Sequence, residues 1–131
     1  MIYLDSSAML RLVLDGENSD QLSTYLRAHS AQRTVSSALA VVEVRRAIMR
    51  NQASRHEQEA SEVLLAGSLM VPISSIVITE ASRLKDRLLR SLDAIHLATA
   101  RVIGADFTGF IAYDKRLDAA ARTLGLPCPA S

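Results

Sequence analysis

The stretch MIYLDSSAML, residues 1–10, contains the pattern that decides the fold. Its first four residues are apolar and Asp5 follows at once, which predicts a short buried strand that ends at an acid. Ser6 and Ser7 favour a helix start, so we predict that they cap a helix continuing to Leu14. A buried strand that runs directly into a helix is typical of a parallel α/β domain.

The same alternation continues along the chain, with a turn expected at Gly16 and Asn18. Further short apolar strands are predicted at 34–36, 69–73 and around 110–112, with a terminal strand near 126–128. Helices are predicted at 20–29, 38–52, 54–67, 74–89, 92–103 and 114–124, two of them capped by Ser37 and Ser91. Because the strands lack polar alternation, both faces of the sheet should be covered. We therefore predict a single α/β domain over residues 1–131, with three layers and a short parallel β-sheet flanked by helices.

Two acids follow predicted strands directly. Asp5 ends the first strand, and Asp114 comes just after the strand near Ala112. Ligands of open parallel sheets gather outside the carboxyl ends of the strands. We therefore expect Asp5 and Asp114 to lie at the same functional edge.

Glu43 is the most unusual acid in the sequence. Its neighbours three and four residues away include Leu39, Ala40 and Ala47, which places it at the border of an apolar helix face. Burying a carboxylate there is costly unless a partner offsets the desolvation. An internal ion pair with Arg46 or another arginine is the structural explanation, and a catalytic role is the functional one.

Asp93 lies in the first turn of a predicted helix, where an acid is favoured by the helix dipole alone. It shares a face with Leu97 and Ala100, which turns it towards the core side. His96 is one helical turn further along. We expect this histidine to be packed or hydrogen-bonded in the core, because the three histidines of the chain show no zinc-ligand spacing.

A site built only from carboxylates prefers hard cations such as Mg²⁺ or Mn²⁺. Without a cation, crowded carboxylates repel one another and tend to retain protons. One or two bound ions can activate water and stabilise a leaving oxygen, as in nucleases and phosphatases.

The bulk composition limits the remaining classes. The net charge is +1, so charge alone predicts no nucleic-acid partner, and Cys128 is the only cysteine, which excludes a disulfide framework within one chain. The N-terminus lacks the pattern of a signal peptide, and no apolar run is long enough for a membrane span. We expect a cytoplasmic protein.

Four segments together resemble the PIN-domain ribonucleases, specifically the VapC toxins of toxin–antitoxin pairs. They are IYLDSSAML, SSALAVVEVRRAI, LRSLDAIHLATA and FIAYDKRLDAAARTLGL, which span residues 2–126 in the family's order. The resemblance implies an endoribonuclease dependent on Mg²⁺ or Mn²⁺, a five-stranded parallel sheet, RNA as substrate, a cognate antitoxin and a homodimer.

The resemblance also implies roles for the acids. Asp5 and Asp93 would be the firmest metal ligands, Asp114 would complete the set, and Glu43 would orient a water or bind a second ion. A Ser after the first acid, Ser6 or Ser7, would support the site. The sequence departs from the family pattern at Ala112, where similar proteins often carry Thr or Ser. Asp118 is either a fifth acid or a solvated helix residue.

We predict that basic residues near the acids contact the RNA, because phosphate binding depends on such charges; they are Arg11, Arg45, Arg46, Lys115 and Arg116. A receiver domain would need an acidic pair after the first strand, and a haloacid-dehalogenase-type phosphatase would need an acid at position 7; neither is present. The alternative that stays open is a catalytically inactive PIN-like binding module.

Overall fold

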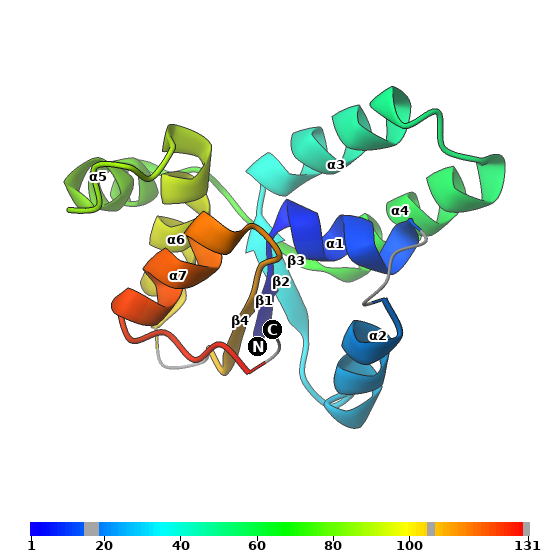
Figure 1. Ribbon diagram of the computed structural model, residues 1–131, viewed down its shortest axis with the longest axis horizontal. Helices are drawn as coiled ribbons and strands as arrows, with labels where there is room; N and C mark the ends of the chain where they lie inside the picture. Colours follow the sequence, from blue (N-terminus) through cyan, green and yellow to red (C-terminus); the bar gives the residue numbers. More distant parts are fainter. Residues whose placement is uncertain (15–18, 105–106, 130–131) are drawn as a thin grey trace.

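A four-stranded parallel sheet runs through the middle of the molecule (Figure 1). The structure is a computed structural model that describes residues 1–14, 19–104 and 107–129; the turn predicted at 16–18 lies outside these residues. The strand order is β3-β2-β1-β4, so the first strand of the chain is central. The strands are β1 (Ile2–Leu4), β2 (Thr34–Ser37), β3 (Leu69–Val71) and β4 (Gly109–Ile111).

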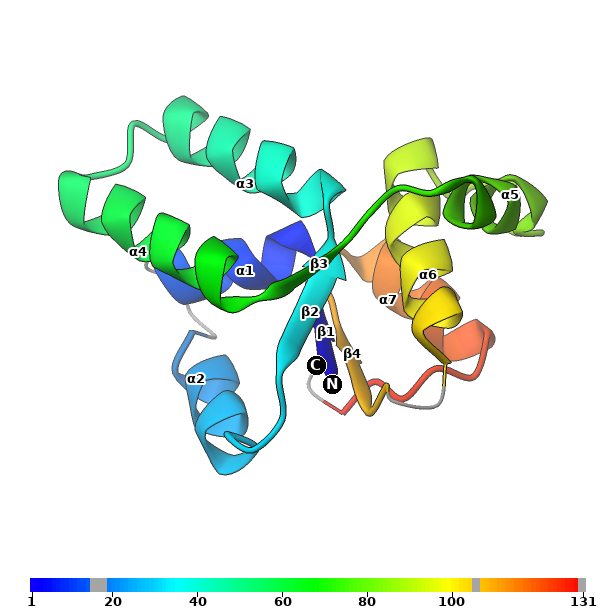
Figure 2. The ribbon, with the colours of Figure 1, turned by 180° about the vertical axis from the view of Figure 1, so that it is seen from behind.

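Helices cover both faces of the sheet, which confirms the predicted three-layer α/β class. Figure 2 shows one group of helices, α1 to α4, on one side of the sheet and α5 to α7 on the other. Their bounds are α1 (Ser6–Val13), α2 (Ser19–Ala28), α3 (Leu39–Arg50), α4 (Arg55–Gly67), α5 (Ser75–Arg83), α6 (Ser91–Ile103) and α7 (Lys115–Thr123). Among the described residues, no helix is long and apolar enough to cross a membrane.

The side chains of β1 divide the core into two parts. Ile2 and Leu4 pack with the first helix group, whereas Tyr3 packs with Leu97 and Phe110 on the α6–α7 side. This division follows from the period of two in a strand, where successive side chains point to opposite faces. All three β1 residues are buried, as expected for a central parallel strand.

Three sequence expectations need correction. The segment near 126–128 is no strand among the described residues, although the Phe110 amide donates to the Pro127 carbonyl at 2.7 Å, so the described sheet has four strands rather than five. The helix expected to reach 89 ends at Arg83, since the Leu84 backbone is extended. Ser91 does not cap α6, because Arg90 is the N-cap residue and makes no side-chain cap bond.

Candidate active site

Asp5 stands at the junction of β1 and α1. The prediction that Ser6 and Ser7 cap α1 is wrong, because Asp5 is the N-cap residue and its Oδ1 accepts from the Ala8 amide at 2.9 Å. Ser7 instead donates its hydroxyl to the same Oδ1 at 2.6 Å. The Ser7 Oγ in turn accepts from the Tyr113 amide at 2.9 Å, beyond the end of β4. Ser7 thus links the carboxyl ends of the neighbouring strands β1 and β4 at Asp5.

Burial dominates the electrostatics of Asp5. The residue is only 3% exposed, and desolvation raises its pKa from 3.8 to about 6. The hydrogen bonds from the Ser7 hydroxyl and the Ala8 amide act in the opposite direction, and the negative charge of Glu43 adds to the rise. The folded protein therefore holds a carboxylate where ionisation is costly without a compensating cation.

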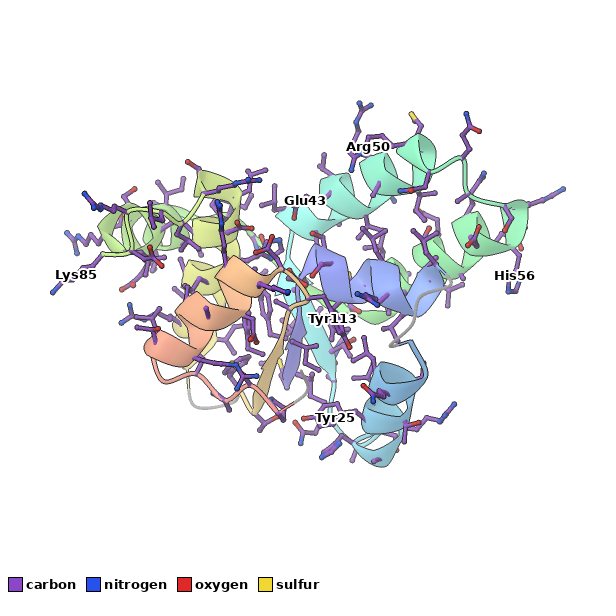
Figure 3. The ribbon with its side chains drawn as sticks, viewed as in Figure 1. Tyr25, Glu43, Arg50, His56, Lys85 and Tyr113 are labelled. Atoms are coloured by element: carbon purple, nitrogen blue, oxygen red, sulfur yellow. The ribbon has the colours of Figure 1, made fainter. Side chains whose placement is uncertain are left out.

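Glu43 lies in the second turn of α3, and Figure 3 shows it near the start of that helix, on the side of the sheet's carboxyl ends. Its partner is not Arg46, the residue considered from sequence. The Glu43 Oε1 is 2.6 Å from His96 Nε2, and His96 Nδ1 is 2.7 Å from the Tyr3 hydroxyl. His96 is therefore buried and hydrogen-bonded, as predicted. Its link to Glu43 had no sequence signal, since 53 residues separate the two.

Asp93 is half-buried in the first turn of α6. Desolvation is the main cause that raises its pKa, and the negative charges of Asp114 and Glu43 raise it further, while the charge of Arg90 acts against the rise. These interactions place Asp93 within electrostatic reach of Glu43 and Asp114. A helix-capping role does not account for such neighbours.

Asp114 is the N-cap residue of α7, as its position before that helix predicted. Its Oδ1 accepts from the Arg116 and Leu117 amides, each at 3.0 Å, and the residue is exposed. The preceding Ala112 is buried in the core between the sheet and the α6–α7 layer. Asp118 is paired with Arg122 on its own helix, and its Oδ2 accepts from the Arg122 guanidinium at 2.9 Å.

The four acids come from four elements and share one edge of the sheet, but they are not drawn tightly together. In the described part of the chain, no three His, Cys, Asp or Glu side chains stand close enough to hold one ion as they are oriented. Their oxygen-only, partly desolvated donor set nevertheless fits a hard divalent cation. Like-charged carboxylates repel, so a cation is what would allow them to converge.

Four arginines near the acids have three kinds of surroundings. Arg45 makes two hydrogen bonds to Glu62, at 2.7 and 3.1 Å, on the side of α3 that faces α4. Arg46 and Arg50 instead line a groove of about 420 Å³ that also includes Glu43, and within the described ranges neither has an ion-pair partner. Arg11 lies over the ring of Tyr113, 4.7 Å from its centroid.

Comparisons with known proteins give the family. A family model described as the PIN domain matches residues 2–123. Ribonuclease VapC46 of Mycobacterium tuberculosis is 42% identical over 125 residues, covering 95% of this chain and 93% of that protein. Ribonuclease VapC47 of the same species is 37% identical over 127 residues, with coverage of 95% and 93%.

A solved structure confirms the fold. The crystal structure of Mycobacterium tuberculosis VapC20, a toxin that cleaves the sarcin-ricin loop, superposes with a TM-score of 0.71. The superposition covers 92% of this chain and 95% of that chain at 19% identity. By sequence and fold, the chain belongs to the PIN-domain family, among the VapC ribonucleases.

Proposed function

We propose that the protein is a Mg²⁺-dependent endoribonuclease that acts as the toxin of a toxin–antitoxin pair and hydrolyses RNA phosphodiester bonds. The observation that carries the proposal is the set Asp5, Glu43, Asp93 and Asp114 at one edge of the sheet. The negative charges of Asp114 and Glu43 raise the pKa of Asp93 there. The ribonuclease names of relatives at 37–42% identity support the reaction class. The same proposal places the protein in the cytoplasm, with its RNA substrate.

The four acids would have different roles at the cation. Asp5 and Asp93 would hold the cation most firmly, because Asp5 is buried and Asp93 half-buried, and a bound cation would offset the desolvation that raises the pKa of both. Asp114 would complete the set from the start of α7, and Glu43 would orient the attacking water or hold a second ion. When bound, Mg²⁺ or Mn²⁺ lowers the pKa of water and stabilises charge on the phosphate.

The exposed arginines of α3 would bind the RNA backbone. Arg46 and Arg50 border the groove beside Glu43 and are available for bidentate phosphate contacts. Arg45 is occupied by Glu62 on another side of the helix, so we remove it from the set of RNA contacts predicted from sequence.

Matched substitutions test this assignment. Arg46→Ala should weaken RNA binding and reduce the slope of log affinity against log salt by about 0.7, the value for one phosphate of a single strand. Arg45→Ala, a change of the same kind one residue away, should leave the slope unchanged. Equal slopes for the two variants would remove Arg46 from the interface.

Exposed apolar residues support the proposal that the protein binds a cognate antitoxin and forms a homodimer. Val42, Met49 and Val63 on α3 and α4 are 59–72% exposed and offer a surface for a cognate antitoxin. Ile76 and Ile78 on α5 are also more than half exposed, and they offer a separate surface for a homodimer. Size-exclusion chromatography of the protein alone and with its antitoxin would test both.

The direct test is incubation of purified protein with total RNA, with Mg²⁺ and with a chelator. A discrete product that requires Mg²⁺ and is absent with Asp5→Asn would establish the activity and identify the RNA. Intact RNA under all conditions, together with retained RNA or antitoxin binding, would favour the alternative of an inactive PIN-like binding module.

A further inference from the structure

A chain of hydrogen bonds connects the middle of the sheet with the candidate active site. It begins at the Tyr3 hydroxyl on β1, passes through both ring nitrogens of His96 on α6, and ends at Oε1 of Glu43 on α3. The two contacts are 2.7 and 2.6 Å long. Tyr3 is 0% and His96 1% exposed, whereas the Glu43 side chain is 23% exposed. The chain thus leads from a dry interior to a partly solvated acid.

The donors and acceptors of this chain can be assigned from chemistry. A carboxylate only accepts hydrogen bonds, so His96 Nε2 must carry the proton in its contact with Glu43. A neutral imidazole then accepts at Nδ1, and the Tyr3 hydroxyl donates to it. Burial raises the pKa of Tyr3, so its hydroxyl keeps the proton that this bond needs.

The surroundings of Tyr3 hold the far end of the chain still. Its ring stacks on Phe110 with centroids 5.1 Å apart and meets the His96 ring edge-on at 5.9 Å. Both rings therefore have little freedom to rotate within the packed core. A rigid imidazole that donates to one carboxylate oxygen restricts the rotamers of an otherwise flexible glutamate.

A purely structural role could also satisfy the hydrogen bonds of the buried His96 ring. The interpretation therefore depends on where the acceptor, Glu43, lies. The negative charge of Glu43 raises the pKa of both Asp5 and Asp93, which puts the outer end of the hydrogen-bond chain among the acids. We propose that Tyr3 and His96 are positioning residues that hold Oε1 of Glu43, leaving its second oxygen for the reaction. This inference rests on the proposed ribonuclease function.

Kinetics test whether the chain acts through Glu43. His96→Asn should lower kcat by about 10- to 100-fold, the usual cost of removing a supporting hydrogen bond at such a site. Tyr3→Phe should lower kcat less, and neither change should alter KM for RNA. In a Glu43→Gln background, His96→Asn should cause no further loss, because the coupled residues are not independent.

A second Tyr–His pair elsewhere in the protein provides a matched control. Tyr25 and His29 at the end of α2 also lie ring against ring, with centroids 4.3 Å apart, and His29 Nδ1 contacts the Tyr25 carbonyl. Tyr25→Phe and His29→Asn should therefore leave kcat unchanged. The positioning role is overturned if His96→Asn keeps the wild-type kcat, or if it costs the same factor with and without Glu43.

A spectroscopic readout separates this inference from the proposed function. In ¹⁵N-labelled protein without cation, the His96 ring should be the neutral form protonated at Nε2, and Mg²⁺ should shift its resonances. Tyr3→Phe should shift Nδ1 while the fold, followed by circular dichroism, stays intact. A proton on Nδ1, or no response to Mg²⁺, would overturn the positioning role even if RNA is cleaved. If RNA is not cleaved but both signals appear, the proposed function fails and the link between the chain and a cation site stands.

Discussion

Asp5 and Asp114 make the same local structure in very different surroundings. Each follows one of two adjacent parallel strands, and each caps a helix by accepting backbone amides at Oδ1. Asp5 is buried and its pKa is raised to about 6, whereas Asp114 is exposed. A capping role accounts for the position of the exposed Asp114 side chain, but it does not explain why a carboxylate is buried at Asp5. The comparison indicates that Asp5 is kept at a cost to stability for the sake of its charge.

The largest expected difference is in RNA cleavage. Asp5→Asn should lower kcat by at least about a thousandfold, because a central acid of a catalytic set is lost. Asp114→Asn should lower it by about 10- to 100-fold, since the exposed acid only completes the set. Single-turnover cleavage of the identified RNA measures both. Equal losses of kcat would show that the difference in burial does not determine how much each acid contributes to catalysis.

The next difference is in stability, where Asp5→Asn should be favourable although it removes activity. The pKa of Asp5 is higher in the folded than in the unfolded protein, so the folded state binds more protons between about pH 4 and 6. The contribution of Asp5 to the free energy of unfolding therefore falls as pH rises through this range and stays low above it. Asp5→Asn should stabilise the cation-free protein at pH 7.5 by up to about 3 kcal/mol, since each pKa unit corresponds to about 1.4 kcal/mol.

Urea unfolding at pH 4, 6 and 7.5 checks this prediction. Asp114→Asn is the matched control, and it should change the free energy of unfolding by less than about 0.5 kcal/mol because Asn caps a helix as well as Asp does. A loss of stability in Asp5→Asn at pH 7.5 would mean that the carboxylate is part of the structural framework.

The sequence predicted the two strand-end acids but not their different surroundings. An apolar run that stops at an acid is visible at Asp5 and near Asp114, and parallel pairing places both at one edge. Burial depends instead on which elements pack over each strand end. The contact of Ser7 with the Tyr113 amide joins residues 106 positions apart, and no local pattern encodes it.

The helix caps and the partner of Glu43 also depend on tertiary packing that local sequence patterns do not predict. Ser7 and Ser91 were predicted to cap helices from their residue type, but neighbouring backbone geometry gives those places to Asp5 and Arg90. Glu43 was correctly placed at the border of an apolar face, while its partner is His96 on another helix rather than Arg46 on its own. Short-range periodicity predicted elements and faces, and tertiary packing selected the partners.

The smallest effect is expected at Asp118. This acid lies one helical turn beyond Asp114 and is paired with Arg122 at 2.9 Å. Asp118→Asn should change kcat by less than about twofold and stability by less than about 1 kcal/mol, the range for exposed ion pairs. The same cleavage and urea assays apply. A loss comparable with that of Asp114→Asn would make Asp118 a fifth acid of the site.

Direct binding of Mn²⁺ tests the central claim that the four acids form one cation site. Titration calorimetry at pH 7.5 would compare the wild type with Asp5→Asn, Glu43→Gln, Asp93→Asn and Asp114→Asn, with Asp118→Asn as control. Asp5→Asn and Asp93→Asn should abolish measurable binding, Asp114→Asn and Glu43→Gln should weaken it, and Asp118→Asn should leave it unchanged. Wild-type Mn²⁺ affinity in both Asp5→Asn and Asp93→Asn would contradict the account.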